Sequence, residues 1–331
     1  KNLKTYFFLD EGTVKAVDGA TFDIPYGQTL GVVGESGCGK SVVARSILRI
    51  VDPPGRIVDG QIIYHRAKRG PGAPTVDLAQ LNPTGREIRA IRGAEIAMIF
   101  QEPMTSLSPV YTIGNQIIEA LEQHETISKQ EGRRRAIELL QHVGMPRPER
   151  QVDAYPHQLS GGMRQRAMIA MALSCNPSLL IADEPTTALD VTTQAQILEL
   201  MLRLKQETGM SIVMITHDLG VIAETAQSVV VMYLGRVAEV ADVRSLFHDP
   251  KHPYTQALLQ SIPKVGRRAR TRLRPVTGMI PSPYNRPKGC LFHPRCASFI
   301  KGTCDVAEPP LISPGPGRSV SCWLYADKGQ T

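Results

Sequence analysis

Short apolar runs recur along the chain and predict its framework. Four runs of five or six almost wholly apolar residues lie at residues 29–33, 95–100, 178–182 and 211–216. Runs of this length are typical of strands buried on both faces of a sheet. Segments with helical spacing of apolar residues lie between them, at residues 41–50, 112–157, 160–173 and 190–207. The pattern therefore predicts an α/β fold.

The start of the chain and a long middle segment have different patterns. Apolar and polar residues alternate over residues 14–33 with turn residues between them, which predicts antiparallel strands joined by tight turns. Residues 60–64 form a further strand-like piece. Over 112–157 the period is helical, so we interpret residues from about 105 to 165 as a helical subdomain inserted into the core.

A glycine-rich stretch joins the first buried run to the first helix. It consists of Gly34, Glu35, Ser36, Gly37, Cys38, Gly39, Lys40 and Ser41, and it fits G-x-x-x-x-G-K-[ST]. Its glycines allow backbone N–H groups to close around phosphates, and the helix start adds partial positive charge. Lys40 is expected to reach the β- and γ-phosphates, and Ser41 to bind Mg²⁺. A chance glycine turn also matches, but the strand and helix on either side favour a P-loop NTPase core.

Polar residues that could bind Mg²⁺ or act on a phosphate lie at the ends of two other predicted strands. Asp183 ends a buried strand and suits a Mg²⁺ ligand acting through water. Glu184 follows it and is placed to orient and polarise an attacking water. His217 ends the strand at 211–216 and can contact a γ-phosphate. Alternatively, Asp183 and Glu184 are two acids that only end a strand, and His217 has a structural role.

A second helix start also has the features of an anion site. Ser160 occupies an N-cap position, and Gly161 and Gly162 leave backbone N–H groups open to an anion. Since the chain already has one phosphate loop, we infer that this helix start serves a nucleotide held by another subunit.

The order of these motifs over about residues 10–240 resembles that of the ATP-binding cassette (ABC) ATPases. The matching residues are 34–41, Gln101, Ser160, Gly161, Gly162, Asp183, Glu184, Asp190 and His217. The resemblance implies ATP hydrolysis, with Gln101 as the Q-loop residue and a further Mg²⁺ ligand. It makes 160–162 the signature, Asp183 the Walker B acid, Glu184 the catalytic glutamate, Asp190 the D-loop residue and His217 the switch histidine. Two cassettes would pack head to tail around ATP.

Segments 100–107, 182–192 and 252–259 further resemble the oligopeptide, dipeptide and nickel importers. The resemblance implies an ATP-hydrolysing subunit that powers uptake of di- or oligopeptides, with nickel and oligosaccharides as alternative cargoes. It implies a peripheral position at the cytoplasmic face of the inner membrane, two permease subunits and, indirectly, an extracytoplasmic substrate-binding protein. Met163 replaces the Gln of the general signature and is typical of one of two paralogous ATPases, which implies a heterodimer.

A different class, the soluble cassette ATPases acting on DNA or ribosomes, is disfavoured. Its members usually have long coiled-coil insertions or two cassettes in one chain, neither of which this sequence contains, so we expect no nucleic-acid partner. A cassette that only regulates would lack Glu184 or His217.

No run approaches the roughly 18 apolar residues of a membrane span, which predicts a soluble, intracellular protein. The net charge is +7, and much of the positive excess lies at 264–274, which we interpret as a solvated linker rather than a nucleic-acid or membrane patch.

Four cysteines lie in residues 246–331, which we interpret as an extension of a nucleotide-binding domain at 1–245. They are Cys290, Cys296, Cys304 and Cys322, spaced C-x5-C-x7-C-x17-C. Clustered thiols among Pro and Gly are typical of metal ligands. Zinc sites usually include a C-x2–4-C pair, so the spacing favours a [4Fe–4S] cluster over Zn²⁺, with free or paired thiols as the remaining alternative. Residues 289–296 also resemble the cluster-bearing tails of some peptide importers.

Overall fold

The protein is described here by a computed structural model that covers residues 1–66, 73–101, 106–187, 189–262 and 276–326. The chain forms two compact units. The first comprises Lys1–Asp23, Leu30–Ile63 and Thr216–Thr331, and the second comprises Ile24–Thr29 and Tyr64–Ile215. The basic segment 264–274 and parts of segments 100–107 and 182–192 lie outside the described residues.

An antiparallel layer opens the first unit. It consists of β1 (Leu3–Leu9), β2 (Gly12–Ala20) and β4 (Gly55–Asp59), in the order β2-β1-β4. Its β2 strand confirms the start of the antiparallel pattern predicted for 14–33. The rest of that prediction is wrong, because residues 21–25 form no strand and the buried run at 29–33 pairs in parallel. Residues 60–62 also form no strand.

The sheet strands of the first unit follow the order β12-β13-β11-β10-β3. Their bounds are β3 (Thr29–Val33), β10 (Ser228–Tyr233), β11 (Arg236–Asp242), β12 (Ile312–Gly315) and β13 (Arg318–Val320). Strands β3 and β10 are parallel and nearly completely buried, as the apolar run at 29–33 predicts. The helices are α1 (Lys40–Ile47), α9 (Leu219–Thr225), α10 (Val243–His248), α11 (Pro253–Gln260) and a short 3-10 turn at His293–Arg295.

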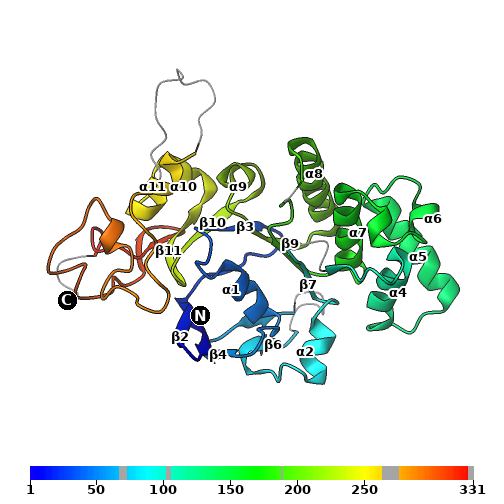
Figure 1. Cartoon of the computed structure of the whole chain (residues 1–331), viewed down its shortest axis with the longest axis horizontal. Helices are drawn as coiled ribbons and strands as arrows, with labels where there is room; N and C mark the ends of the chain where they lie inside the picture. Colours follow the sequence, from blue (N-terminus) through cyan, green and yellow to red (C-terminus); the bar gives the residue numbers. More distant parts are fainter. Residues whose placement is uncertain (67–72, 102–105, 188, 263–275, 327–331) are drawn as a thin grey trace, which may run out of the picture. The chain divides into compact units, whose positions relative to one another are not determined.

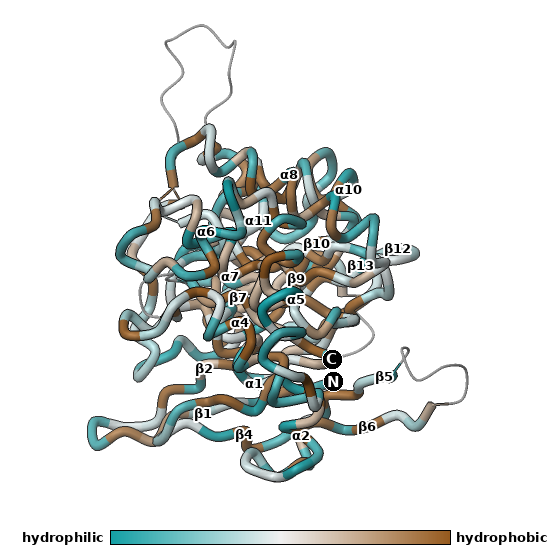
Figure 2. Tube along the Cα trace, turned by 90° about the vertical axis from the view of Figure 1, so that its right-hand side faces the viewer, coloured by the Kyte–Doolittle hydropathy of each residue, from teal (hydrophilic) through white to brown (hydrophobic). Residues whose placement is uncertain are grey.

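Three parallel strands form the centre of the second unit, in the order β9-β8-β7. They are β7 (Ile96–Ile99), β8 (Leu179–Asp183) and β9 (Ser211–Ile215). Every residue of β8 and β9 is buried, and β9 lies in a hydrophobic stretch of the tube in Figure 2. Helix α8 (Val191–Thr208) connects β8 to β9 and ends at Gly209, whose φ of +69° suits a helix C-cap.

The remaining helices of the second unit include three within residues 112–157, where the sequence predicts helical structure. Their bounds are α2 (Arg86–Ile91), α4 (Ile113–Glu122), α5 (Lys129–His142), α6 (Pro148–Gln151) and α7 (Gly161–Leu173), with 3-10 turns at Leu78–Gln80 and Pro156–Gln158. Helices α4, α5 and α7 pack against one another around Ile117, Leu121 and Leu140, each at most 1% exposed (Figure 1). A short pair of strands, β5 (Ile63–His65) and β6 (Thr75–Asp77), precedes them.

Among the described residues, no helix combines the length and apolarity needed to cross a membrane.

Candidate nucleotide site

The predicted phosphate loop lies between β3 and α1, and its backbone requires glycine at two positions. Gly34 has a φ of +151°, and a Cβ there would lie 2.2 Å from the Met232 carbonyl oxygen. Gly39 has a φ of +102°, and a Cβ there would lie 2.2 Å from the Ala16 carbonyl oxygen. Backbone contacts this close cannot be relieved by rotating a side chain, so any other residue would displace the loop.

Lys40 is the first residue of α1 and is buried inside the loop, with 6% of its surface exposed. Its Nζ donates to the carbonyl oxygens of Gly34 at 2.8 Å and Glu35 at 3.2 Å. A phosphate oxygen would be a stronger acceptor than either carbonyl, because both partners would then be charged. The loop therefore holds a cation close to where the sequence predicts the β- and γ-phosphates.

Cys38 contributes packing to the loop. Its amide donates to the Glu35 carbonyl, and its carbonyl accepts from the amide of Gly235. Burial raises the pKa of the Cys38 thiol, so the thiol stays neutral at physiological pH and does not act as a nucleophile.

The acidic pair of the second unit lies where β8 ends. Asp183 is the last residue of β8 and is 3% exposed. Glu184 follows with a φ of +49°, a left-handed conformation that costs about 1–3 kcal/mol for such a residue. Its amide donates to the Ile215 carbonyl at 2.9 Å, and this bond to the end of β9 helps to hold the strained turn.

Two side chains fix the Glu184 carboxylate. The Gln101 side-chain amide donates to Oε2 at 3.1 Å, and the Thr187 hydroxyl donates to the same oxygen at 3.0 Å. The structure thus brings together the residues predicted as Q-loop glutamine and catalytic glutamate. A carboxylate held by two donors keeps one orientation, which suits a group that must align a water molecule.

The predicted signature and D-loop residues are linked within the second unit. Ser160 is exposed and caps α7, its hydroxyl accepting from the Met163 amide at 3.3 Å. Asp190 caps α8 and holds Thr193 through both the Thr193 amide and hydroxyl, at 2.9 and 2.7 Å. These bonds lower the pKa of the Asp190 carboxyl. A Cβ at Gly162 would lie 2.7 Å from Thr193 Cγ2, so glycine allows the two helix starts to approach closely.

The predicted site residues divide between the two units. Residues 34–41 and His217 belong to the first unit, and His217 is exposed just after β9. Gln101, 160–162, Asp183, Glu184 and Asp190 belong to the second unit. Their joint action on one nucleotide, and the shared Mg²⁺ ligation by Ser41, Gln101 and Asp183, stay predictions.

The four tail cysteines are all free thiols, and Cys304 and Cys322 are buried. Burial, together with the charges of neighbouring cysteines, raises the pKa of Cys290 and of Cys322 to about 11. The thiols therefore lie within one another's electrostatic influence. Within the described part of the chain, no three or more His, Cys, Asp or Glu side chains are placed to hold a metal ion. The predicted metal site is not confirmed and stays a prediction.

Comparison with known proteins identifies the family. A family model described as "ABC transporter" matches residues 17–187, and one described as "Oligopeptide/dipeptide transporter, C-terminal region" matches residues 238–304. The chain therefore belongs to the ABC transporter family, and within it to the ATP-binding proteins of the oligopeptide and dipeptide transporters. Membership of this family confirms the ATPase prediction.

Two curated relatives match over nearly the whole chain. The oligopeptide transport ATP-binding protein AppD of Bacillus subtilis is 51% identical over 99% of this chain and 96% of its own. The dipeptide transport ATP-binding protein DppD of Escherichia coli is 47% identical over 98% and 95%. A solved ATP-binding cassette, a dimer in a post-hydrolysis state bound to ADP and Pi, is 28% identical with a TM-score of 0.63 over 74% of this chain and 97% of that one. These matches confirm the predicted P-loop fold.

Two residues that support the phosphate loop carry no sequence motif that assigns them to it. Arg295 and Tyr254, both from the C-terminal part of the chain, contact Glu35. Residue 254 lies in the segment 252–259 that resembles importer tails, and residue 295 lies between two predicted cysteine ligands. Their positions in these motifs were visible in the sequence, but their common partner was not.

Proposed function

We propose that this chain hydrolyses ATP to power the uptake of di- or oligopeptides through a membrane permease. The observation that carries the proposal is the near-complete alignment with relatives named for oligopeptide and dipeptide transport, at 51% and 47% identity. The C-terminal match at 238–304 supports it, because this region is described for the same transporters. Nickel and oligosaccharides remain the alternative cargoes.

The proposed chemistry assigns one task to each group. Residues 34–41 bind the ATP phosphates, with Lys40 neutralising charge on the β- and γ-phosphates. Ser41, Gln101 and Asp183 offer hydroxyl, amide and carboxylate oxygens, the donor types that Mg²⁺ prefers, and the bound ion would neutralise phosphate charge. Glu184 aligns the attacking water and accepts its proton, while Gln101 keeps the carboxylate in place. His217 contacts the γ-phosphate.

The proposed assembly is a heterodimer with a paralogous ABC ATPase. Ser160, Gly161 and Gly162 would contact the nucleotide bound to the partner's phosphate loop, and Asp190 would support this edge through Thr193. The exposed N-cap at Ser160 supports this role. The heterodimer would dock on two permease subunits at the cytoplasmic face of the inner membrane and receive cargo indirectly from an extracytoplasmic binding protein. No nucleic acid takes part.

The proposed domain division is a nucleotide-binding domain at 1–245, with its helical subdomain at about 105–165, and an extension at 246–331. In the extension we propose that Cys290, Cys296, Cys304 and Cys322 hold a [4Fe–4S] cluster. The burial of Cys304 and Cys322 and the mutual influence of the four thiols support a common cofactor, because uncompensated thiolates would repel one another there. The bound cluster would hold together loops that have little apolar core of their own.

Reconstitution tests the proposed transport function. The chain, its paralogue and the permease are placed in vesicles with the binding protein, and ATP hydrolysis is measured with and without peptide. We expect di- or oligopeptides to stimulate hydrolysis by about tenfold and to accumulate only when ATP is present. The Lys40→Ala complex serves as a control that should remain inactive. Stimulation by nickel or an oligosaccharide, but not by peptides, would replace the peptide assignment.

Metal analysis tests the proposed cluster. Protein purified without oxygen is expected to contain about four irons per chain and to absorb broadly near about 400 nm. Cys304→Ser should remove this absorbance, whereas Cys175→Ser, a change at a cysteine outside the extension, should leave it. One zinc per chain without iron would favour Zn²⁺, and protein without metal would favour free or paired thiols.

A further inference from the structure

The phosphate loop is anchored from outside by the C-terminal extension through one residue, Glu35. The Arg295 guanidinium forms a two-pronged ion pair with the Glu35 carboxylate, with Nη1 to Oε2 at 2.7 Å and Nη2 to Oε1 at 3.0 Å. The Arg295 side chain is 3% exposed and that of Glu35 is 22% exposed. A partly buried pair of this geometry is less screened than a surface ion pair.

Arg295 itself is held by its surroundings. Its Nε donates to the Thr277 carbonyl at 3.0 Å, while Nη1 reaches the Tyr233 hydroxyl at 3.3 Å and Nη2 the Val276 carbonyl at 3.4 Å. With the bonds to Glu35, these contacts engage all three nitrogens of the guanidinium. Lysine offers one ammonium in place of this planar fork, so it cannot replace the set.

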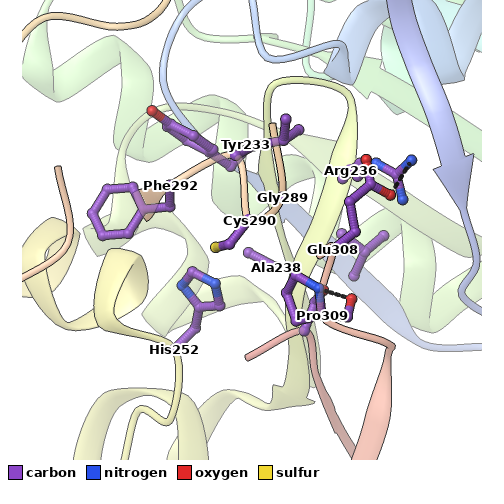
Figure 3. A pocket seen from close by; sticks show the side chains of 12 residues that line it. Tyr233, Arg236, Ala238, His252, Gly289, Cys290, Phe292, Glu308 and Pro309 are labelled. Carbon is purple, nitrogen blue, oxygen red and sulfur yellow. Dashed lines mark hydrogen bonds and ion pairs between the residues drawn. The ribbon is translucent and has the colours of Figure 1, made fainter. Parts of the chain in front are cut away.

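The backbone of Glu35 has a second anchor. Its amide donates to the Tyr254 hydroxyl at 2.9 Å, and Tyr254 is 0% exposed. The Tyr254 ring packs on Tyr233 and Phe292, with centroids 4.7 and 5.3 Å away. Figure 3 shows Tyr233 and Phe292 near Cys290, on the wall of one small pocket. The segment between Cys290 and Cys296 therefore contributes both Phe292 and Arg295 to the support of the loop.

We propose that Arg295 and Tyr254 are positioning residues for ATP, acting through Glu35. Glu35 directly follows Gly34, and its carbonyl accepts from Lys40 Nζ. A shift of Glu35 would therefore move the lysine and the loop amides together. The extension sets the geometry of the phosphate loop before ATP arrives, which reduces the cost of ordering the loop on binding. The inference rests on the proposed role of residues 34–41 in phosphate binding.

ATP binding by the full-length chain tests this inference. Arg295→Met removes the ion pair and keeps an apolar stem, and we expect ATP affinity to fall about tenfold. Tyr254→Phe removes only the hydroxyl and should lower affinity by about threefold, since a single hydrogen bond is lost. Arg318→Met is the matched control, because Arg318 ties the same extension to Glu239 without contacting the loop, and it also pairs with Asp249 inside the extension. It should change affinity by less than about twofold.

Kinetics of the assembled transporter separate positioning from catalysis. Arg295→Met should raise the KM for ATP by about tenfold and change kcat by less than about twofold. Glu35→Gln combined with Arg295→Met should be no worse than Arg295→Met alone, because both changes break the same pair. Unchanged ATP affinity in Arg295→Met and Tyr254→Phe, or equal losses in Arg318→Met, would overturn the inference. Lys40→Ala distinguishes failure of this inference from failure of the proposed phosphate-binding role of residues 34–41. If Lys40→Ala also leaves ATP binding intact, the proposed phosphate loop itself is wrong.

Discussion

Glu184→Gln is expected to lower ATP hydrolysis by the assembled transporter by about 10²-fold or more, while ATP still binds. Glutamine has nearly the same size and can still accept the hydrogen bonds from Gln101 and Thr187, so the local structure should persist. It cannot take a proton from water at neutral pH. The loss should therefore appear in kcat, because the missing interaction acts on the attacking water.

Steady-state hydrolysis and nucleotide affinity together check this expectation. Glu199→Gln is a suitable control, because Glu199 is an exposed glutamate of α8 and should tolerate the same change without effect. Thr187→Val should have an intermediate effect, since it removes one of the two donors that orient the carboxylate. Near-normal hydrolysis by Glu184→Gln would remove Glu184 from the catalytic role.

The core of the fold could be predicted because its signals are local. The run at 178–182 is wholly buried in the structure, and a strand buried on both faces leaves a continuous apolar run. The phosphate loop was predictable for a similar reason, because Gly34 and Gly39 occupy positions where a Cβ would collide with backbone. In both places a short stretch of sequence indicates the conformation, although the backbone that a Cβ would meet belongs to Met232 and Ala16 elsewhere in the chain.

The alternation at 14–33 led to a wrong prediction of antiparallel strands throughout, because the segment contains strands of two kinds. Strand β2 belongs to an antiparallel layer, whereas β3 is buried and pairs with β10 in parallel. The strand-like piece at 60–64 is confirmed only at residues 63–64, which belong to β5, because Gly60 has a φ of +94° and β4 ends at Asp59. A left-handed glycine breaks a strand even where the neighbours are apolar.

The contacts that shape the site were beyond sequence reasoning, because they join residues far apart in the chain. Gln101 and Glu184 were each identified by their motif, but their hydrogen bond depends on where the two loops lie. Arg295 and Glu35 are separated by 260 positions, and opposite charges are too common for this pair to be recognised. Motifs could therefore identify the residues, while their partners required the structure.

Ser160→Arg is expected to prevent ATP from being shared between the two cassettes of the proposed heterodimer and to lower its hydrolysis by about tenfold or more. The exposed Ser160 hydroxyl caps α7 and lies beside Gly161, at the helix start that is predicted to face the partner's nucleotide. An arginine side chain would fill the space that a γ-phosphate needs. ATP binding to the phosphate loop of the same chain should remain, because that loop does not depend on the cap.

The control for this variant is Ser160→Ala, which removes the cap without adding bulk. Loss of an N-cap costs about 1 kcal/mol of stability, so Ser160→Ala should fold. It should lose less hydrolysis than Ser160→Arg, because it removes one contact to the nucleotide and adds no bulk. The difference between the two variants then measures the block at the shared site. If Ser160→Arg and Ser160→Ala hydrolyse ATP equally well in the heterodimer, or if the isolated chain at low concentration is as active as the heterodimer, the shared-site assignment is wrong. In that case the exposed helix start at Ser160 would have only a structural role.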